Sequence, residues 1–495
     1  MFGDTAQFGS LVQVGVFVGL TALVGLLTWW KVRGASHDGS DKDVYLGGKG
    51  LSWFFVAGSI TLTNLSTDQL VGMNGNQMLL LAWWEIAGFV GLMALAFVFV
   101  PLYYRYNCTT VTELLERRYD GRSIRTLISG LFLAGNILIY LPAALYSGGL
   151  FLQSLFGSGI PLIGFSIGLA LVGAAYTIFG GLRAVAVMDT FSGIGILFLA
   201  LVIVFLALAA VDWDIVTGVP AERLSMVGAS DSPIPFHTLF TGMAFIQIFY
   251  WSTNQNITQK AMAAPTVKEA QKGVFAAAAV RILIVPPIVV IPGVVAYKLF
   301  GDVGDAAYGR LVAEVLPSWL SGAFAAMVAA AVITTFSAVL NSTVALYSVD
   351  FHEQFLGKVK NHWKLGAVMS TLATVLAVML VPMYQSAESI INLLQQLNGL
   401  SSMPILSAFI AGLFFRNVSA ISAIAGVVWG VALYGTFTFW LEPMGIIAMH
   451  YIDFMVITLV TSVLAALAFN RLVLGCKAEF IGLALFRGDE LASKA

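Results

Sequence analysis

Seven polar side chains crowd into nine positions of an otherwise apolar stretch: Thr61, Thr63, Asn64, Ser66, Thr67, Asp68 and Gln69. A membrane-spanning helix with so many polar groups is costly unless each group finds a partner. Irregular backbone at membrane depth occurs only where it is buried in protein or lines a cavity. The stretch therefore predicts a transmembrane helix that is interrupted at a solute or ion site.

A second polar stretch lies five predicted spans further along the chain. Its aromatic and amide side chains are Gln247, Phe249, Tyr250, Trp251, Asn254 and Gln255. Flat rings stack on the apolar face of a pyranose, while amides bond its hydroxyls. Aromatic residues are also ordinary core residues, and this chain has 35 phenylalanines, so the prediction of a carbohydrate site depends on the combination.

Four ionisable residues lie at the expected membrane depth or at its margin: Asp68, Glu85, Asp189 and Arg281. Each is costly to bury and is a functional candidate for that reason. The alternatives are a structural helix–helix partner for Glu85 and a helix end in water for Asp189. Because Arg281 is the one cation expected inside a span and Glu85 can offset it, a neutral polyhydroxylated solute is favoured over an anion.

Three hydroxyl groups, those of Thr334, Thr335 and Ser337, fall in the middle of another predicted span. Hydroxyls and free backbone carbonyls are hard oxygen ligands that suit a sodium ion. The alternative is that these hydroxyls bond back to carbonyls one turn earlier, as is common in transmembrane helices. The neighbouring interrupted helix favours ion binding.

The composition is that of an integral membrane protein. Of the 495 residues, 59% are apolar and 10% are charged, against about 25% charged in soluble domains, and the mean hydropathy is +0.89. The net charge of −1 and the lack of a basic cluster give no indication of nucleic-acid binding. The two cysteines predict no disulfide framework, and no catalytic constellation is visible, so an enzyme is not expected.

The apolar runs predict an all-α protein with about 13 transmembrane helices. They start near residues 11, 52, 80, 124, 160, 185, 237, 273, 318, 364, 387, 418 and 446. With the N-terminus outside and the C-terminus in the cytoplasm, all but four of the 25 cations fall in cytoplasmic segments, as expected for a bacterial-type plasma (inner) membrane. The exceptions are Arg223, Lys298 and Arg310 outside and Arg281 within a span.

Two interrupted helices at corresponding positions of two five-helix halves are typical of inverted-repeat transporters. The predicted organisation is an extra helix and loop (1–51), a first repeat (52–212), an external loop (213–236) and a second repeat (237–416). Two peripheral helices (417–470) and a cytoplasmic tail (471–495) follow.

Three segments resemble the sodium/solute symporter family, and within it the sodium/glucose (galactose) cotransporter branch. They are Thr63-Asn-Leu-Ser-Thr-Asp-Gln-Leu-Val-Gly-Met73, Gly180-Gly-Leu-Arg-Ala-Val-Ala-Val-Met-Asp189, and Tyr250-Trp251 with Asn254-Gln255 and Gln271-Lys-Gly273. The resemblance runs from about residue 12 to residue 470. It implies a LeuT-like five-plus-five inverted repeat whose first and sixth core helices are interrupted, with Na⁺ driving sugar inward by alternating access.

The resemblance also implies roles for individual residues. Asn64, Gln69, Glu85, Arg281 and Gln395 would hold the sugar, Gln247 falls at a sugar-contacting position, and Tyr250, beside Trp251, would be an inner gate. Sodium would bind the carbonyls of Leu62, Leu65 and Ala331 and the hydroxyls of Thr334 and Thr335. Sugar, sodium and membrane lipid are the expected partners, without nucleic acid, and a monomer is sufficient.

The chain departs from this pattern at several positions. Galactose symporters of the branch have lysine at Arg281, asparagine at Gln247, tyrosine at Phe249 and serine at Gly88. Members with a second sodium use an aspartate, here Asp189, and two adjacent hydroxyls, here Ser337 and Ala338, so one sodium per sugar is expected. Sialic-acid members use an arginine in the fourth span, which has none here.

The substrate alternatives therefore remain open. A hexose such as galactose or glucose is expected, and a polyol, a uronate, sialic acid or a nucleoside on the same fold are the alternatives. A solute sensor that does not transport is a further alternative.

Overall fold

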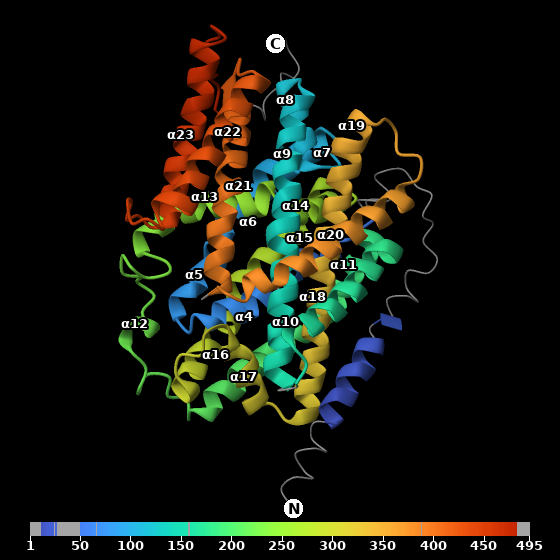
Figure 1. Ribbon diagram of the computed structural model, residues 1–495, viewed down its shortest axis with the longest axis vertical. Coiled ribbons are helices and arrows are strands. Elements are labelled where there is room, and N and C mark those ends of the chain that lie inside the picture. Colours follow the sequence, from blue (N-terminus) through green and yellow to red (C-terminus); the bar gives the residue numbers. More distant parts are fainter. Residues whose placement is uncertain are drawn as a thin grey trace, which may run out of the picture.

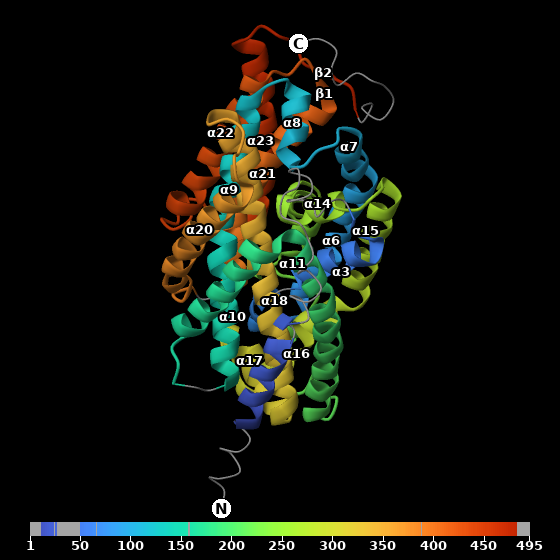
Figure 2. The ribbon, with the colours of Figure 1, turned by 90° about the vertical axis from the view of Figure 1, so that its right-hand side faces the viewer.

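The computed structural model describes residues 11–23, 25–26, 50–65, 67–156, 159–387 and 389–482. It is a bundle of helices elongated along one axis (Figures 1 and 2). The elements of the first half are α3 (Trp53–Asn64), α4 (Thr67–Gly75), η2 (Leu79–Ala82), α5 (Trp83–Ile86), α6 (Gly88–Ala94), η3 (Leu95–Phe99), α7 (Val100–Arg105), α8 (Val111–Tyr119), α9 (Arg122–Gly135), η4 (Asn136–Tyr140), α10 (Leu141–Phe156), α11 (Leu162–Ala210) and α12 (Ala221–Leu224).

The second half continues with the same kinds of element. They are η5 (Phe236–Phe240), α13 (Gly242–Ile248), η6 (Phe249–Thr253), α14 (Gln255–Met262), α15 (Val267–Leu283), α16 (Val285–Phe300), η7 (Gly304–Ala306), α17 (Ala307–Val315), α18 (Ser318–Ala345), η8 (Leu346–His352), α19 (Glu353–Phe355), α20 (His362–Tyr384), α21 (Ile390–Phe414), β1 (Phe415–Arg416), α22 (Ala420–Thr436), η9 (Phe437–Leu441), α23 (Tyr451–Leu472) and β2 (Glu479–Phe480).

In the part of the chain that the structure describes, ten helices are long and apolar enough to cross a membrane, and a shorter apolar helix covers Leu11–Leu23. The pairs α3–α4 and α13–α14 are not among the ten, since each piece has 12 residues or fewer. The prediction of an all-helical, multi-pass membrane protein is confirmed.

Both predicted interruptions are present. Helix α3 ends at Asn64, and Leu65 leaves the helical region with φ −73° and ψ 61° before α4 begins at Thr67. In the second interruption Asn254 is extended (φ −80°, ψ 124°), and its side chain accepts the N–H of Asn256 at 2.9 Å. Asn254 is therefore the N-cap of α14, because it satisfies one of the amides that a helix start leaves free.

One predicted boundary differs. The sequence analysis places two separate spans here, starting near residues 160 and 185, but α11 is helical without a break over 49 residues, through the Gly180-Gly181 pair. The two glycines therefore leave the helical backbone hydrogen bonding in place, although residues 162–179 and 193–210 each qualify as a span. The side chain of the candidate Asp189 lies outside the described residues.

Helix α18 forms the centre of the bundle. Every residue from 328 to 345 is buried, and the helix packs against α10, α11, α3 and α14 (Figure 2). The two hydroxyls predicted to bind an ion, on Thr334 and Thr335, thus lie deep inside the protein and on a helix that contacts the first interruption.

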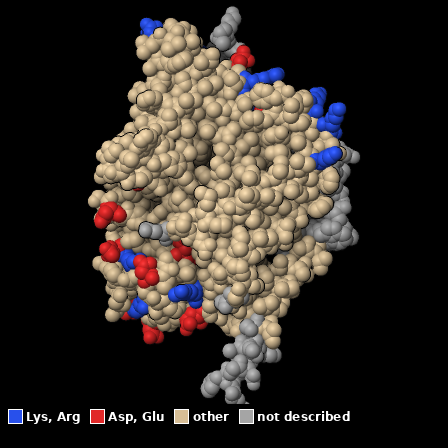
Figure 3. Space-filling model, in the orientation of Figure 1, with Lys and Arg blue, Asp and Glu red and all other residues tan. Residues whose placement is uncertain are grey.

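Opposite charges gather at the two ends of the molecule. Figure 1 places α7, α8 and α19 at one end and α12, α16 and α17 at the other. Exposed cations near the first end include Arg117, Arg122, Lys358 and Lys364, and exposed acids near the other include Glu222, Asp231, Asp302 and Glu314. Figure 3 shows this trend on one face: Asp and Glu lie mostly toward the bottom, where a few Lys and Arg lie among them, and most Lys and Arg lie toward the top.

At the acidic end, Asp305 of η7 joins three elements. Its Oδ2 accepts the N–H of Ile390, at the start of α21, at 2.9 Å. A Cβ placed on Gly75, at the end of α4, would lie 2.5 Å from its Oδ1. Burial raises the pKa of this carboxyl to about 7.

The last described segment folds back onto α21. Strands β1 and β2 pair antiparallel, with Phe415 opposite Phe480. Asn470, near the end of α23, donates to the carbonyls of Asn417 at 2.8 Å and Cys476 at 3.0 Å. The segment after α23 is therefore attached directly to the end of α21.

Candidate functional site

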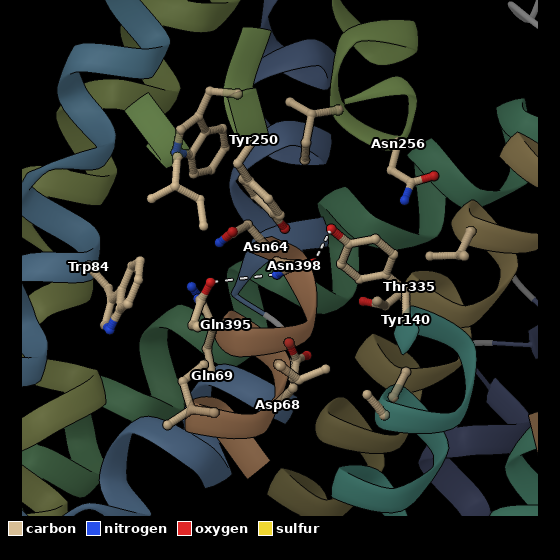
Figure 4. Close-up of a pocket in the computed structure, with 18 of the residues that line it drawn as sticks. Asn64, Asp68, Gln69, Trp84, Tyr140, Tyr250, Asn256, Thr335, Gln395 and Asn398 are labelled. Carbon is tan, nitrogen blue, oxygen red and sulfur yellow. Dashed lines mark hydrogen bonds between the residues drawn. The ribbon is translucent and has the colours of Figure 1, made fainter. Parts of the chain in front are cut away.

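A cavity lies between the two interrupted helices. Its empty space measures about 920 Å³ when the part open to solvent is included. Side chains of α5, η4, α10, α15, α18 and α21 complete it (Figure 4). The residues that bring polar atoms to its lining are Asn64, Asp68, Gln69, Tyr140, Gln247, Tyr250, Trp251, Asn256, Arg281, Thr335, Gln395 and Asn398.

A buried ion pair lies at one wall of this cavity. Glu85 of α5 and Arg281 of α15 are in direct contact, with 0% and 1% of their side chains exposed. Gln69 also donates to Glu85, at 2.7 Å. The pair can be buried because each charge neutralises the other and both carboxylate oxygens accept a hydrogen bond.

Asn64 connects this pair to the first interruption. With its amide oxygen toward α15, it accepts from Gln69 Nε2 at 2.8 Å and from Arg281 at 3.1 Å, and its nitrogen donates to the hydroxyl of Tyr250 at 3.3 Å. This orientation gives each atom of the amide a complementary partner. Both interruptions therefore belong to one hydrogen-bonded network.

Another part of the wall is formed by α21 and η4. Tyr140 donates to Asn398 Oδ1 at 2.8 Å, and Asn398 Nδ2 approaches Gln395 Oε1 at 3.5 Å (Figure 4). Tyr140 is the last residue of η4, a π-helical turn between α9 and α10. Such turns place side chains out of the regular helical register and are frequent at functional sites.

The candidate ion ligands lie beside the cavity. Thr334 donates to the carbonyl of Ala331 at 3.1 Å, so its hydroxyl makes the back-bond that was the alternative prediction for this residue. Thr335 lines the cavity, and its buried hydroxyl has no hydrogen-bond partner among the described residues. A buried hydroxyl without a partner is unfavourable, and a bound cation would supply one.

Leu62 and Leu65 are the other candidate ion ligands, through their backbone carbonyls. They lie at the end of α3, where the last carbonyls of a helix lack intrahelical partners, and α3 packs against α18. The carbonyls of Leu62, Leu65 and Ala331 and the hydroxyl of Thr335 are all oxygen donors, the kind that suits a sodium ion. Ser337 differs, because its hydroxyl donates to the carbonyl of Gly173 at 2.9 Å.

Seven of the eight predicted solute-binding residues line one cavity: Asn64, Gln69, Gln247, Tyr250, Trp251, Arg281 and Gln395. Glu85, the eighth, lies behind Gln69 and Arg281. Sequence reasoning did not assign Tyr140, Asn256 and Asn398 to the site. Asn256 lies in the second polar stretch and Asn398 follows Gln395 and Gln396 in a predicted span, so the crowding of polar side chains that identified Asn64 could have pointed to both, whereas Tyr140 carries no comparable signal.

Comparison with known proteins identifies the family to which this architecture belongs. The model of the sodium:solute symporter family matches residues 44–430. The chain belongs to the sodium:solute symporter family. It is 34% identical over 454 residues to an uncharacterized symporter of Escherichia coli, YidK, covering 86% of this chain and 79% of that one. It is 28% identical to the sodium/glucose cotransporter of Vibrio parahaemolyticus (94% and 90% covered) and 25% identical to the sodium/myo-inositol cotransporter 2 of Bos taurus (87% and 69%).

Solved structures confirm the fold. The outward-open, substrate-bound structure of a Na⁺-coupled sialic acid symporter matches with a TM-score of 0.78 at 18% identity, covering 95% of this chain and 99% of that one. A nucleobase-cation-symport-1 family transporter in a closed conformation matches with a TM-score of 0.55 at 16% identity, covering 87% and 94%. The predicted LeuT-like fold is confirmed, and family and fold are those of sodium-coupled symporters rather than enzymes.

Proposed function

We propose that this symporter imports a neutral hexose, such as galactose or glucose, together with one sodium ion. The observation that carries the proposal is the cavity between the two helix interruptions, where amides, an aromatic wall and a neutralised ion pair meet. Asn64, Gln69 and Gln395 supply donors and acceptors for solute hydroxyls, and Trp251 and Tyr250 supply ring surface.

The charges of the cavity support a neutral solute. The guanidinium of Arg281 is balanced by Glu85, and Asp68 adds a further carboxylate to the lining. A uronate or a sialic acid would bring its own carboxylate next to Asp68, while Arg281, the one cation among the described lining residues, is already paired with Glu85; this is unfavourable. The same hydroxyl recognition would serve a polyol such as myo-inositol, which is therefore the second candidate.

Sodium would bind the carbonyls of Leu62, Leu65 and Ala331 and the hydroxyls of Thr334 and Thr335. The unpartnered hydroxyl of Thr335 supports this assignment, because it lines the solute cavity and lies on the helix that contacts α3. Asp189 and Ser337 are the candidates for a second sodium. The residue next to Ser337 is Ala338, which has no hydroxyl, and this supports a single ion per solute.

The proposed coupling is energetically sufficient. One charge that crosses 100 mV yields about 2.3 kcal/mol, and a tenfold sodium gradient adds about 1.4 kcal/mol. Together they sustain a solute gradient of several hundredfold. We place the N-terminus outside and the C-terminus in the cytoplasm, with repeats at 52–212 and 237–416 that rock around the site. The separation of charge between the two ends of the molecule supports this orientation.

The test is uptake of labelled D-galactose, D-glucose and myo-inositol into proteoliposomes, with sodium or potassium outside. Sodium-dependent uptake of a hexose that is lost in Thr335→Ala and Gln69→Ala supports the proposal. Thr371→Ala and Gln153→Ala serve as matched controls, because Thr371 bonds the carbonyl of Ala367 in α20, Gln153 bonds the carbonyl of Ile160 between α10 and α11, and neither residue lines the cavity. Sodium-dependent uptake of myo-inositol alone would replace the hexose, and uptake without any effect of sodium would overturn the ion site.

A further inference from the structure

The indole of Trp251 is held from several sides by residues of different elements. Its N–H donates to Gln247 Oε1 at 2.9 Å, and the guanidinium of Arg281 lies 4.5 Å from the centre of its ring. The ring of Tyr250 packs against it edge to face, with the two ring centres 5.3 Å apart and the ring planes at 81°. The side chain of Trp251 is almost fully buried, yet it reaches the lining of the cavity.

Gln247 acts as a bridge between this indole and the backbone of α5. Its Nε2 donates to the carbonyl of Trp84 at 2.8 Å, while its Oε1 accepts from Trp251. Protein groups therefore occupy both ends of the amide. Because a side chain shorter by one methylene would withdraw the amide by about 1.5 Å, an asparagine here could not keep both bonds.

Gly88, the first residue of α6, leaves the space that this bridge uses. A Cβ on Gly88 would lie 3.1 Å from Trp251 Nε1 and 3.7 Å from Gln247 Oε1. The first distance is tighter than ordinary van der Waals contact, so a serine would press on the indole while Gln247 is present. With a shorter residue at 247, the same serine hydroxyl would be within reach of the indole N–H as a new acceptor.

We infer that Gln247 and Gly88 are a matched pair of positioning residues that set the place of the Trp251 ring. Through that ring they set the place of Arg281 and of the Glu85 carboxylate that Arg281 holds. Solute specificity then depends on this pair through Trp251, and Gln247 is not primarily a solute ligand. The inference deepens the proposed function, since it takes the solute to lie against Trp251.

The experiment is a double-mutant cycle of Gln247→Asn, Gly88→Ser and the combined variant. The first readout does not need a known solute: it is the thermal midpoint of purified protein and its tryptophan emission, each repeated in a Trp251→Phe background. Each single change should lower the midpoint and shift the emission. The combined variant should restore both, and Trp251→Phe should remove the coupling.

The second readout is sodium-dependent uptake of labelled galactose or glucose. Gln247→Asn should raise KM about tenfold, the effect of losing one buried hydrogen bond, and Gly88→Ser should raise it by a similar factor because it displaces the indole, while the combined variant returns to within about threefold of wild type. The sodium concentration for half-maximal uptake should not change. Gln153→Asn and Gly168→Ser are matched controls. Gln153 bonds the carbonyl of Ile160, which does not line the cavity, and a Cβ on Gly168 would meet nothing within 4 Å.

Additive losses in the combined variant would overturn the inference. So would a higher KM in Gln247→Asn with unchanged emission and midpoint, because that pattern means direct solute contact. If neither hexose is transported, the proposed function fails, whereas the thermal and emission cycle still decides whether the two residues are matched.

Discussion

Glu85→Gln leaves the guanidinium of Arg281 buried without its carboxylate. Because both side chains are at most 1% exposed, the pair is shielded from water, and breaking one partner of such a pair costs about 3–5 kcal/mol. Arg281→Met strands the carboxylate of Glu85 in the same way and should cost a similar amount. The two single changes together would then predict a loss of about 6–10 kcal/mol if they were independent.

The combined variant, Glu85→Gln with Arg281→Met, removes both charges and should lose only about 1–3 kcal/mol, since no isolated charge stays buried. The free energy of unfolding is measured for all four proteins in mixed micelles with rising SDS fraction. Asp302→Asn is the matched control. It breaks the pair between Arg223 and Asp302, whose carboxylate side chain is 64% exposed, and should cost no more than about 1 kcal/mol.

Losses in the combined variant that equal the sum of the single losses within about 0.5 kcal/mol would refute the reasoning, because the two charges would then act independently. A loss below about 1 kcal/mol in Glu85→Gln would do the same. Hexose uptake should stay low in the combined variant even though its stability recovers, which separates the stabilising role of the pair from its role at the solute site.

Three further predictions concern other parts of the chain. The pKa of Asp305 is raised from its usual 3.8 to about 7, so the stability from this protonated carboxyl is present at low pH and lost as pH rises through about 7. Asp305→Asn should therefore remove a fall in thermal midpoint that wild type shows between about pH 5 and pH 8 in scanning fluorimetry. Asn254→Ala removes the N-cap of α14 and should lower the free energy of unfolding by about 1 kcal/mol, whereas Asn254→Asp should largely keep it. Gly91→Ala should prevent folding, measured as loss of the monodisperse peak in gel filtration, because its Cβ would lie 2.1 Å from the carbonyl oxygen of Gln247; Gly168→Ala should not.

The interrupted helices were predictable because their signal is local. Polar residues such as Asn64 and Asn254 stand in apolar runs, and a membrane tolerates such residues only where protein or a cavity surrounds them. The separation of charge between the two ends was also predictable, because the loops between successive spans lie alternately on the two sides of the membrane and the cations are concentrated in every second loop. The sequence could predict only that a buried Arg281 needs a carboxylate to balance its charge. It could not show that Glu85 contacts it directly, because the two residues are 196 positions apart.

Other features depend on side-chain geometry that no local pattern encodes. Tyr140 reaches the cavity through a π-helical turn, and nothing in an apolar sequence marks that turn. The amide of Gln247 bonds both the carbonyl of Trp84 and the indole of Trp251, and because these bonds join separate elements of the fold, no local pattern predicts them. The continuous helix through Gly180 and Gly181 shows that two glycines alone do not determine a turn.

The attachment of the last described segment to the end of α21 has a practical consequence for spectroscopy. Of the two cysteines, Cys108 is buried and Cys476 is exposed, so a maleimide dye should label the native sequence at a single site. Asn470 and the β1–β2 pairing fix that site relative to the helix that carries Gln395 and Asn398. A fluorophore on Cys476 would therefore follow the movement of α21 in real time during turnover, without engineered cysteines or a fused reporter protein.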